Sequence, residues 1–198
     1  MIQRNQRLAG KVGIVVGGGQ TAGDTVGNGR AAAIVFARAG ARLLVVDANL
    51  VAAQATADLI ATEGSEVCAF RSDWTESVAC EAFVALCVAL WGRVDFLHNN
   101  AGVLGTDTDP ALPSEVNFNR VWRTNLIGCL NACQAVLPSM RRRGEGSIVN
   151  ISSVAAVAPT GLLSYRLSKT AMNAPGRELA MLNAPHGIRV NTVMPDHF

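Results

Sequence analysis

Three residues, Ser153, Tyr165 and Lys169, have the chemical types and the spacing that proton transfer requires. Tyr165 and Lys169 are four residues apart, so their side chains share one face if this segment is helical. An ammonium group beside a phenol favours the phenolate and should lower the phenol pKa below its ordinary value of about 10. Such a phenol can pass a proton to or from an alcohol or carbonyl oxygen, and Ser153 can hydrogen-bond the same oxygen.

This segment has no hydride carrier, and the sequence upstream offers a place for one. Residues 12–16 form a short apolar run typical of a strand buried on both faces, and Gly17, Gly18 and Gly19 follow it. After a second cluster, Gly27-Asn28-Gly29, an amphipathic segment reads as a helix that stops near Gly40. Strand, glycine-rich turn and helix open a dinucleotide-binding unit, although a plain tight turn also explains the glycines alone.

Two acidic residues at strand ends strengthen the dinucleotide interpretation. Asp47 ends the strand predicted for residues 42–47, where a carboxylate accepts hydrogen bonds from the adenosine ribose. The alternative is an N-cap for a helix beginning near Leu50, and we favour ribose binding. Asp73 follows the strand predicted for 66–71 and either contacts the ligand or caps the helix that starts near Glu76.

The remaining elements continue the alternation of strands and helices. We expect further strands at 94–98, 147–151 and 188–193, and the long helix at 114–143 carries Asn125. The helix of Tyr165 continues toward Asn183, and Pro175 inside it should kink or break it. The pattern predicts a single α/β domain over residues 1–198, a Rossmann-like, doubly wound parallel sheet in three α/β/α layers. His98 is interpreted as a packed strand residue.

Composition narrows the possible functions. Apolar residues make up 49% of the 198 residues, charged residues 16%, and the formal net charge is +2, so neither disorder nor a nucleic-acid or membrane partner is expected. We find neither an apolar run long enough to span a bilayer nor an apolar signal core at the start. The five cysteines include no CxxC pair, which indicates buried, reduced thiols, no metal site and a cytoplasmic location.

Together these residues resemble the short-chain dehydrogenase/reductase family from about Leu8 to Pro195. The motifs that carry the resemblance are the glycine-rich turn, Asp47, Asp73, NNAG at 99–102, Asn125, Ser153, YRLSK at 165–169 and HGIRVNTVMP at 186–195. The resemblance implies a homo-oligomer, a tetramer or a dimer. It also implies a catalytic tetrad in which Tyr165 is the general acid/base, Ser153 polarises the substrate oxygen, Lys169 binds the nicotinamide ribose and lowers the tyrosine pKa, and Asn125 holds a relay water.

The same resemblance implies a set of residues that bind the dinucleotide. They are Gly17, Gly19, Gln20, Asn28, Gly29, Asp47, Asp73, Trp74, Asn100, Gly102, Thr124, Tyr165, Lys169 and Pro195. We expect NAD rather than NADP, because Asp47 would repel a 2′-phosphate and Gln20, near the phosphates, is not basic.

The sequence departs from the family pattern in four places. Val16 replaces a threonine, and residues 21–26 look like an insertion in the glycine-rich turn. Ser153 is one residue closer to Tyr165 than usual, so Ser152 is the alternative. Pro175 falls in a helix that relatives keep intact. Relatives have glycine where Asp196 follows Pro195, and they continue into a helical substrate lid and a last strand that we expect to be missing after Phe198.

The sequence therefore predicts an NAD-dependent oxidoreductase that interconverts a secondary alcohol and a ketone, a small-molecule substrate. One rival is a catalytically silent dinucleotide-binding protein, a sensor or an oligomer partner. Another is a dehydratase or epimerase that uses bound NAD.

Overall fold

The computed structural model describes residues 6–21, 23, 25–106 and 113–196. Ala22 and Asp24 of the predicted insertion, and Phe198, lie outside the described residues. Within them, six strands form one parallel sheet in the order β3-β2-β1-β4-β5-β6. The strands are β1 (Val12–Val16), β2 (Arg42–Asp47), β3 (Val67–Arg71), β4 (Phe96–Asn99), β5 (Gly146–Ile151) and β6 (Ile188–Val193). The predicted doubly wound α/β fold is confirmed.

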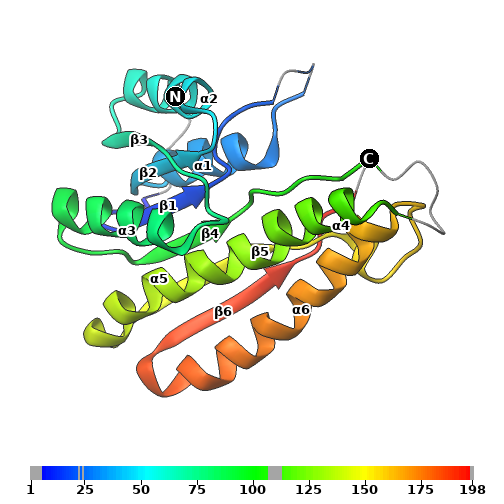
Figure 1. Ribbon diagram of the computed structural model, residues 1–198. Helices are drawn as coiled ribbons and strands as arrows, with labels where there is room; N and C mark the ends of the chain where they lie inside the picture. The colour runs from blue at the N-terminus through cyan, green and yellow to red at the C-terminus, as the bar shows by residue number, and fades with distance from the viewer. Residues whose placement is uncertain (1–5, 22, 24, 107–112, 197–198) are drawn as a thin grey trace.

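Helices connect the strands and cover the sheet (Figure 1). They are α1 (Asn28–Arg38), α2 (Leu50–Thr62), α3 (Ser77–Trp91), α4 (Glu115–Trp122), the π-helical turn η1 (Arg123–Ile127), α5 (Gly128–Arg143), the 3₁₀ turn η2 (Val154–Ala156), α6 (Leu163–Asn183) and the 3₁₀ turn η3 (Ala184–His186).

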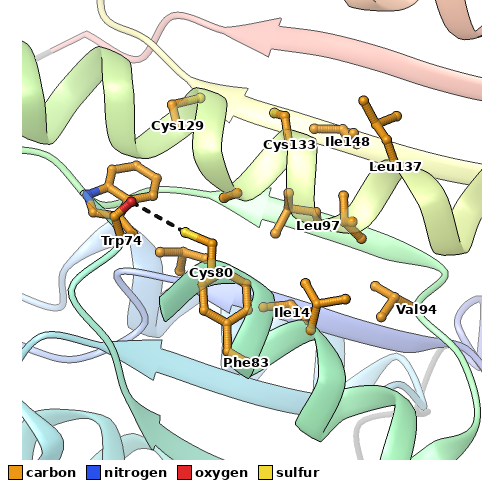
Figure 2. Packing of buried hydrophobic residues seen from close by; sticks show 14 of the residues in the cluster. Ile14, Trp74, Cys80, Phe83, Val94, Leu97, Cys129, Cys133, Leu137 and Ile148 are labelled. Atoms are coloured by element: carbon orange, nitrogen blue, oxygen red, sulfur yellow. Dashed lines mark hydrogen bonds between the residues drawn. The ribbon is translucent and has the colours of Figure 1, made fainter. Parts of the chain in front are cut away.

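Two hydrophobic clusters, one on each face of the sheet, make the three layers. On one face, α1 and α2 pack on β1 and β2 through residues such as Ala33, Leu43 and Ile60. On the other, α3, α5 and α6 pack on the sheet in a larger cluster. Figure 2 shows part of it, including Phe83 of α3 and Leu97 of β4. Side chains of the central strands point alternately into the two clusters, which explains why β1 is apolar throughout.

The order of the strands reverses at β1, which pairs with β2 on one side and β4 on the other. Connections from β1 and β4 therefore leave in opposite directions, and a crevice opens between them at the carboxyl ends of the strands. This reversal fixes where a ligand site can form.

Strands β3 and β5 begin within one residue of the prediction, and three other elements differ more. Strand β4 begins at Phe96 rather than Val94. The long helix predicted for 114–143 contains the π turn η1, which separates α4 from α5. Of the kink or break expected at Pro175, the break is wrong, because α6 runs continuously through this residue. Packing of the buried face of α6 against β6 offsets the loss of one backbone hydrogen bond.

Several polar residues of the core behave as the sequence indicates. His98 is a buried strand residue against the Phe36 ring, and burial lowers its pKa to about 4. Asn99 donates to the Asn150 side chain at 2.9 Å and so ties β4 to β5. Four cysteines are buried and Cys68 is half-buried, all as free thiols. Burial raises the pKa of Cys80 and of Cys87 to about 12, which makes these two thiols unreactive.

Within the described part of the chain, no helix has the length and apolar character that a membrane span needs. Nor does this part bring three or more histidine, cysteine or acidic side chains together as a metal site would require.

Candidate active site

A cavity of about 740 Å³ opens at the carboxyl ends of β1, β2, β3 and β4. Most residues predicted to bind a dinucleotide line it. They are Gly17, Gly19, Gln20, Asn28, Gly29, Asp47, Asp73, Trp74, Asn100, Gly102 and Thr124. Tyr165, Lys169 and Pro195 lie outside this lining. The structure thus brings together segments from residue 16 to residue 124 around one space.

The glycine-rich turn shapes the floor of this cavity. Gly17 has a φ of +73°, a conformation that side chains disfavour, and it turns the chain away from β1. A Cβ atom on Gly29 would lie 1.9 Å from the Gly17 carbonyl oxygen, so the first turn of α1 rests directly on this turn. Asn100 donates to the same carbonyl at 3.1 Å. The N-terminus of α1 is therefore held at the cavity.

Asp47 forms part of the wall, where β2 ends. Its carboxylate accepts hydrogen bonds from the backbone N–H of Gly19 at 2.9 Å and of Asn49 at 3.0 Å. The alternative in which Asp47 caps α2 is wrong, because Asn49 is the N-cap and accepts from Val51 and Ala52. Asp47 is instead a carboxylate fixed in place at the edge of the cavity.

Asp73 and Trp74 form the neighbouring wall. The Asp73 carboxylate accepts from the N–H and the hydroxyl of Thr75, so it stabilises the turn before α3, whose N-cap is Glu76. The Trp74 indole packs on Gly128, where a Cβ atom would lie 2.6 Å from the ring. In Figure 2 its ring lies near Cys129, and the Cys80 thiol donates to its carbonyl at 3.3 Å.

Gln20 also lines the cavity, but its side-chain amide bonds the chain's own backbone. Its nitrogen donates to the carbonyls of Thr21 and Thr25, and its oxygen accepts from the Gly27 N–H. The amide predicted to meet the phosphates thus organises the loop between the two glycine clusters.

Tyr165 and Ser153 form a buried hydroxyl pair where α6 meets the loop after β5. The Ser153 hydroxyl lies close enough to the phenol to affect its pKa, and Tyr165 and Ser153 are only 8% and 3% exposed. The predicted lowering of the phenol pKa is wrong. Burial raises the pKa of Tyr165 above its ordinary value, and the Ser153 hydroxyl offsets this only in part. Ser152, the alternative serine, donates instead to the Lys169 carbonyl at 3.0 Å.

Lys169 shares the helix face of Tyr165, as the four-residue spacing predicts. Its Nζ lies 5.7 Å from the centroid of the tyrosine ring and donates to the Ile151 carbonyl at 2.7 Å. Burial lowers its pKa to about 8. A Cβ atom on Gly102, a residue of the cavity wall, would lie 3.5 Å from this Nζ, so the lysine borders the cavity.

Asn125 lies in the π turn η1 and is fully buried. Its Oδ1 accepts from the Val103 N–H at 2.8 Å, and its Nδ2 donates to the Val103 carbonyl and to the Ser168 hydroxyl. Both ends of the amide therefore anchor the segment after β4 to α6. Because the Asn125 amide is already bonded, a relay water near Lys169 would need another acceptor. A backbone carbonyl that loses its intrahelical partner in the π turn could serve.

Sequence reasoning did not single out three residues that the structure places here. Arg120 and Arg123 line the cavity together with Thr124. Positions 123 and 124 follow Arg120 by three and four residues, so the three side chains share one helix face. Ser168 donates to the Tyr165 carbonyl at 2.7 Å and links it to Asn125. In the sequence, the feature that could have pointed to Ser168 is its position three residues after Tyr165. Pro195, by contrast, lies against η2, where its carbonyl accepts from the Val154 N–H.

Comparisons with known proteins agree with this geometry. The family described as short chain dehydrogenase matches residues 12–198. The 7α-hydroxysteroid dehydrogenase of Escherichia coli strain K12 is 34% identical over 192 residues, which cover 96% of this chain and 72% of that protein.

Solved structures show the same similarity. A structure of 7α-hydroxysteroid dehydrogenase with NADH and 7-oxo glycochenodeoxycholic acid superposes with a TM-score of 0.88 at 34% identity, covering 98% of this chain and 74% of that one. An NAD⁺-bound xylitol dehydrogenase gives a TM-score of 0.89 at 32% identity, covering 96% and 71%.

Proposed function

The chain belongs to the short-chain dehydrogenase family, and we propose that it is an NAD(H)-dependent oxidoreductase that interconverts a secondary alcohol and a ketone. The observation that carries the proposal is the Ser153–Tyr165 hydroxyl pair, with Lys169 bordering a cavity built on a glycine-rich turn. Two structurally similar dehydrogenases were solved with NAD⁺ or NADH, which supports a nicotinamide cofactor.

The residues of the cavity fit a dinucleotide. The first N–H groups of a helix have no intrahelical acceptor, and at α1 they meet the cavity through Asn28 and Gly29. They would bind the pyrophosphate, which the helix dipole also favours. Asp47 would accept from the ribose hydroxyls, and Asp73 with Trp74 would border the adenine. When bound, the cofactor supplies or accepts the hydride.

The preference for NAD over NADP rests on Asp47. Its carboxylate is held by two backbone N–H groups and cannot easily turn away from a ligand. The neighbouring space is tight, because a Cβ atom on Gly19 would lie 2.6 Å from the Asp47 carboxylate and 2.8 Å from the Ala52 side chain. A 2′-phosphate there would meet a fixed negative charge, so we expect NADH to bind more tightly than NADPH.

The proton chemistry would belong to Tyr165. Because burial raises its pKa, the phenol stays protonated at neutral pH and can donate a proton to a ketone oxygen. Ser153 would hydrogen-bond the same oxygen. Lys169 keeps a positive charge close to the phenol when protonated, and Asn125 with Ser168 fixes the helix turns that carry both groups.

Tyr165→Phe tests this assignment, since it removes one hydroxyl and keeps the ring. We expect turnover of secondary alcohols with NAD⁺ to fall about a thousandfold, the scale of general acid–base catalysis. NADH binding, measured by fluorescence titration, should stay within about twofold because Tyr165 lies outside the cavity lining. Retained turnover in the variant would refute the role of Tyr165, and dinucleotide binding without turnover in the unsubstituted protein would favour the silent binding protein.

A further inference from the structure

We propose that Gln20 is a positioning residue of the dinucleotide site, whose side-chain amide fixes the loop that faces the pyrophosphate. The inference rests on the proposed function, because it assigns the ligand of that same cavity. It gives Gln20 an indirect role, in which the residue acts through the backbone of Thr21, Thr25 and Gly27 rather than through a bond to phosphate.

The hydrogen bonds of Gln20 carry the first step of the argument. Its Nε2 donates to the Thr21 carbonyl at 2.7 Å and to the Thr25 carbonyl at 2.9 Å, and its Oε1 accepts from the Gly27 N–H at 2.9 Å. A glutamine amide has two N–H donors and one acceptor oxygen, and all three are used. One side chain thereby joins three points of the loop, which we call the Gln20 clasp.

The second step is the position of the clasp relative to α1. Gly27 is the N-cap of this helix, and its carbonyl accepts the first intrahelical bond, from Ala31. The N–H of Gly27 donates to the Gln20 side chain. Glycine has no side chain that could cap the helix itself. The clasp therefore sets the position of the N–H groups that follow, at Asn28 and Gly29, which border the cavity.

The third step is that the clasped residues themselves form part of the cavity. Gln20, Thr21, Thr25 and Gly27 all line it, beside Asn28 and Gly29. Thr21 and Thr25 are exposed, so little packing holds them in place. Without the clasp, a ligand would have to order this loop itself, and that entropy cost would weaken binding.

The test uses the whole chain and three ligands: NADH, ADP-ribose and adenosine. Gln20→Met keeps the length of the side chain and removes every bond of the clasp. We expect its Kd for NADH and for ADP-ribose to rise about tenfold, the effect of losing a few hydrogen bonds of modest net strength. Adenosine, which has no phosphate, should bind within about twofold of the unsubstituted protein.

Gln54→Met is the matched control. Gln54 is exposed on α2, and its amide donates to the Asp58 side chain away from the cavity. This variant should bind all three ligands as the unsubstituted protein does. Thermal unfolding of both variants checks that neither change disrupts the fold.

Gln20→Glu provides a second, independent readout. It keeps an acceptor for the Gly27 N–H, loses both donors and adds a negative charge close to the expected pyrophosphate. The loss of NADH affinity should exceed that of Gln20→Met at low salt and approach it at high salt, because salt screens the added repulsion. This salt dependence would show that position 20 lies close to the bound pyrophosphate, which a change that acted only through the fold would not produce.

The outcomes separate this inference from the proposed function. If the unsubstituted protein binds NADH and Gln20→Met binds it equally well, the role of Gln20 is refuted while the proposed function stands. An equal loss for adenosine and for ADP-ribose also refutes it, because the damage would then not be specific to the pyrophosphate. If the unsubstituted protein binds no dinucleotide, both proposals fail.

Discussion

Polar groups are bonded differently at the two ends of the parallel strands. We call the side where the strands begin the amino edge and the side where they end the carboxyl edge. At the amino edge, Asp95 accepts from the Val12 N–H at 2.8 Å, from Arg93 and from Arg143, and Glu145 also bonds both arginines. Lys11 lies within 4 Å of both carboxylates. Opposite charges from three separate segments thus pair with one another and tie the starts of β1, β4 and β5 together.

The carboxyl edge leaves polar groups unpaired. Among the described residues, the buried Trp74 Nε1 and Asn99 Oδ1 have no hydrogen-bond partner, and both belong to segments at this edge. Backbone close to the cavity is rich in glycine, so its N–H groups stay accessible. The difference teaches that one edge is built for stability and the other for binding, within a single sheet.

The first prediction tests how closely the carboxyl edge is packed. Gly29→Ala places a Cβ atom 1.9 Å from the Gly17 carbonyl oxygen, so α1 must move away from the turn. We expect the free energy of unfolding to fall by about 3 kcal/mol, at the upper end of overpacking costs. Urea unfolding measures it. Gly27→Ala is the control, because its Cβ atom would meet only the Gln20 side chain at 3.6 Å, and equal stability of the two variants would contradict the expected clash.

The second prediction concerns the amino edge. Asp95→Ala removes the more buried of the two carboxylates that Arg93 and Arg143 share, a side chain only 5% exposed, and leaves them Glu145 alone. Because both arginines are partly exposed, we expect a loss of about 2 kcal/mol, below the range for fully buried pairs. NADH binding should not change. A variant that bound NADH poorly yet unfolded normally would reverse the comparison between the edges.

The pH dependence of this effect follows from the direction of the Asp95 shift. Hydrogen bonds from Arg93, Val12 and Arg143 outweigh burial and lower the pKa of Asp95 below its ordinary 3.8. The native state therefore gains stability above the unfolded pKa and loses it as the pH falls through the folded pKa. The difference in stability between the unsubstituted protein and Asp95→Asn should shrink below about pH 4.

The third prediction tests the cost of burying a charge at the carboxyl edge. The pKa of Lys169 is lowered from 10.5 to about 8, so the unfolded state binds more protons between these values. Stability should consequently rise with pH across that window. Between about pH 7 and about pH 9, the unsubstituted protein should gain about 1 kcal/mol relative to Lys169→Met. A flat difference would show that Lys169 is not desolvated.

Local patterns in the sequence are sufficient to predict most of the fold. Strands β1, β2 and β6 have the predicted bounds, because apolar runs end at glycine, proline or polar residues that stop them. The pairing of Tyr165 with Lys169 on one face likewise depends only on helical spacing. The glycine clusters and Asp47 meet at one cavity because a parallel sheet collects the ends of its strands at one edge.

Features that depend on distant contacts could not be predicted in this way. The ion network around Asp95 joins residues far apart in the chain, and nothing local marks them. The phenol pKa of Tyr165 rises because burial outweighs its neighbours, and burial is a tertiary property. The π turn at Asn125 is hidden in a continuous helical pattern, and in the structure it coincides with the bonds of Asn125 to Val103, a distant residue.

The central position of β1 has a consequence for the order in which the chain assembles during synthesis. β2 emerges soon after β1 and can pair with it early, and α1 and α2 then close one hydrophobic cluster. The other side of β1 stays an open edge until the ribosome has made Phe96, the residue that pairs with Gly13. Unpaired parallel edges bind other chains readily. Among the strands that are paired on both sides in the finished sheet, β1 therefore waits longest for its second partner while the protein is being made.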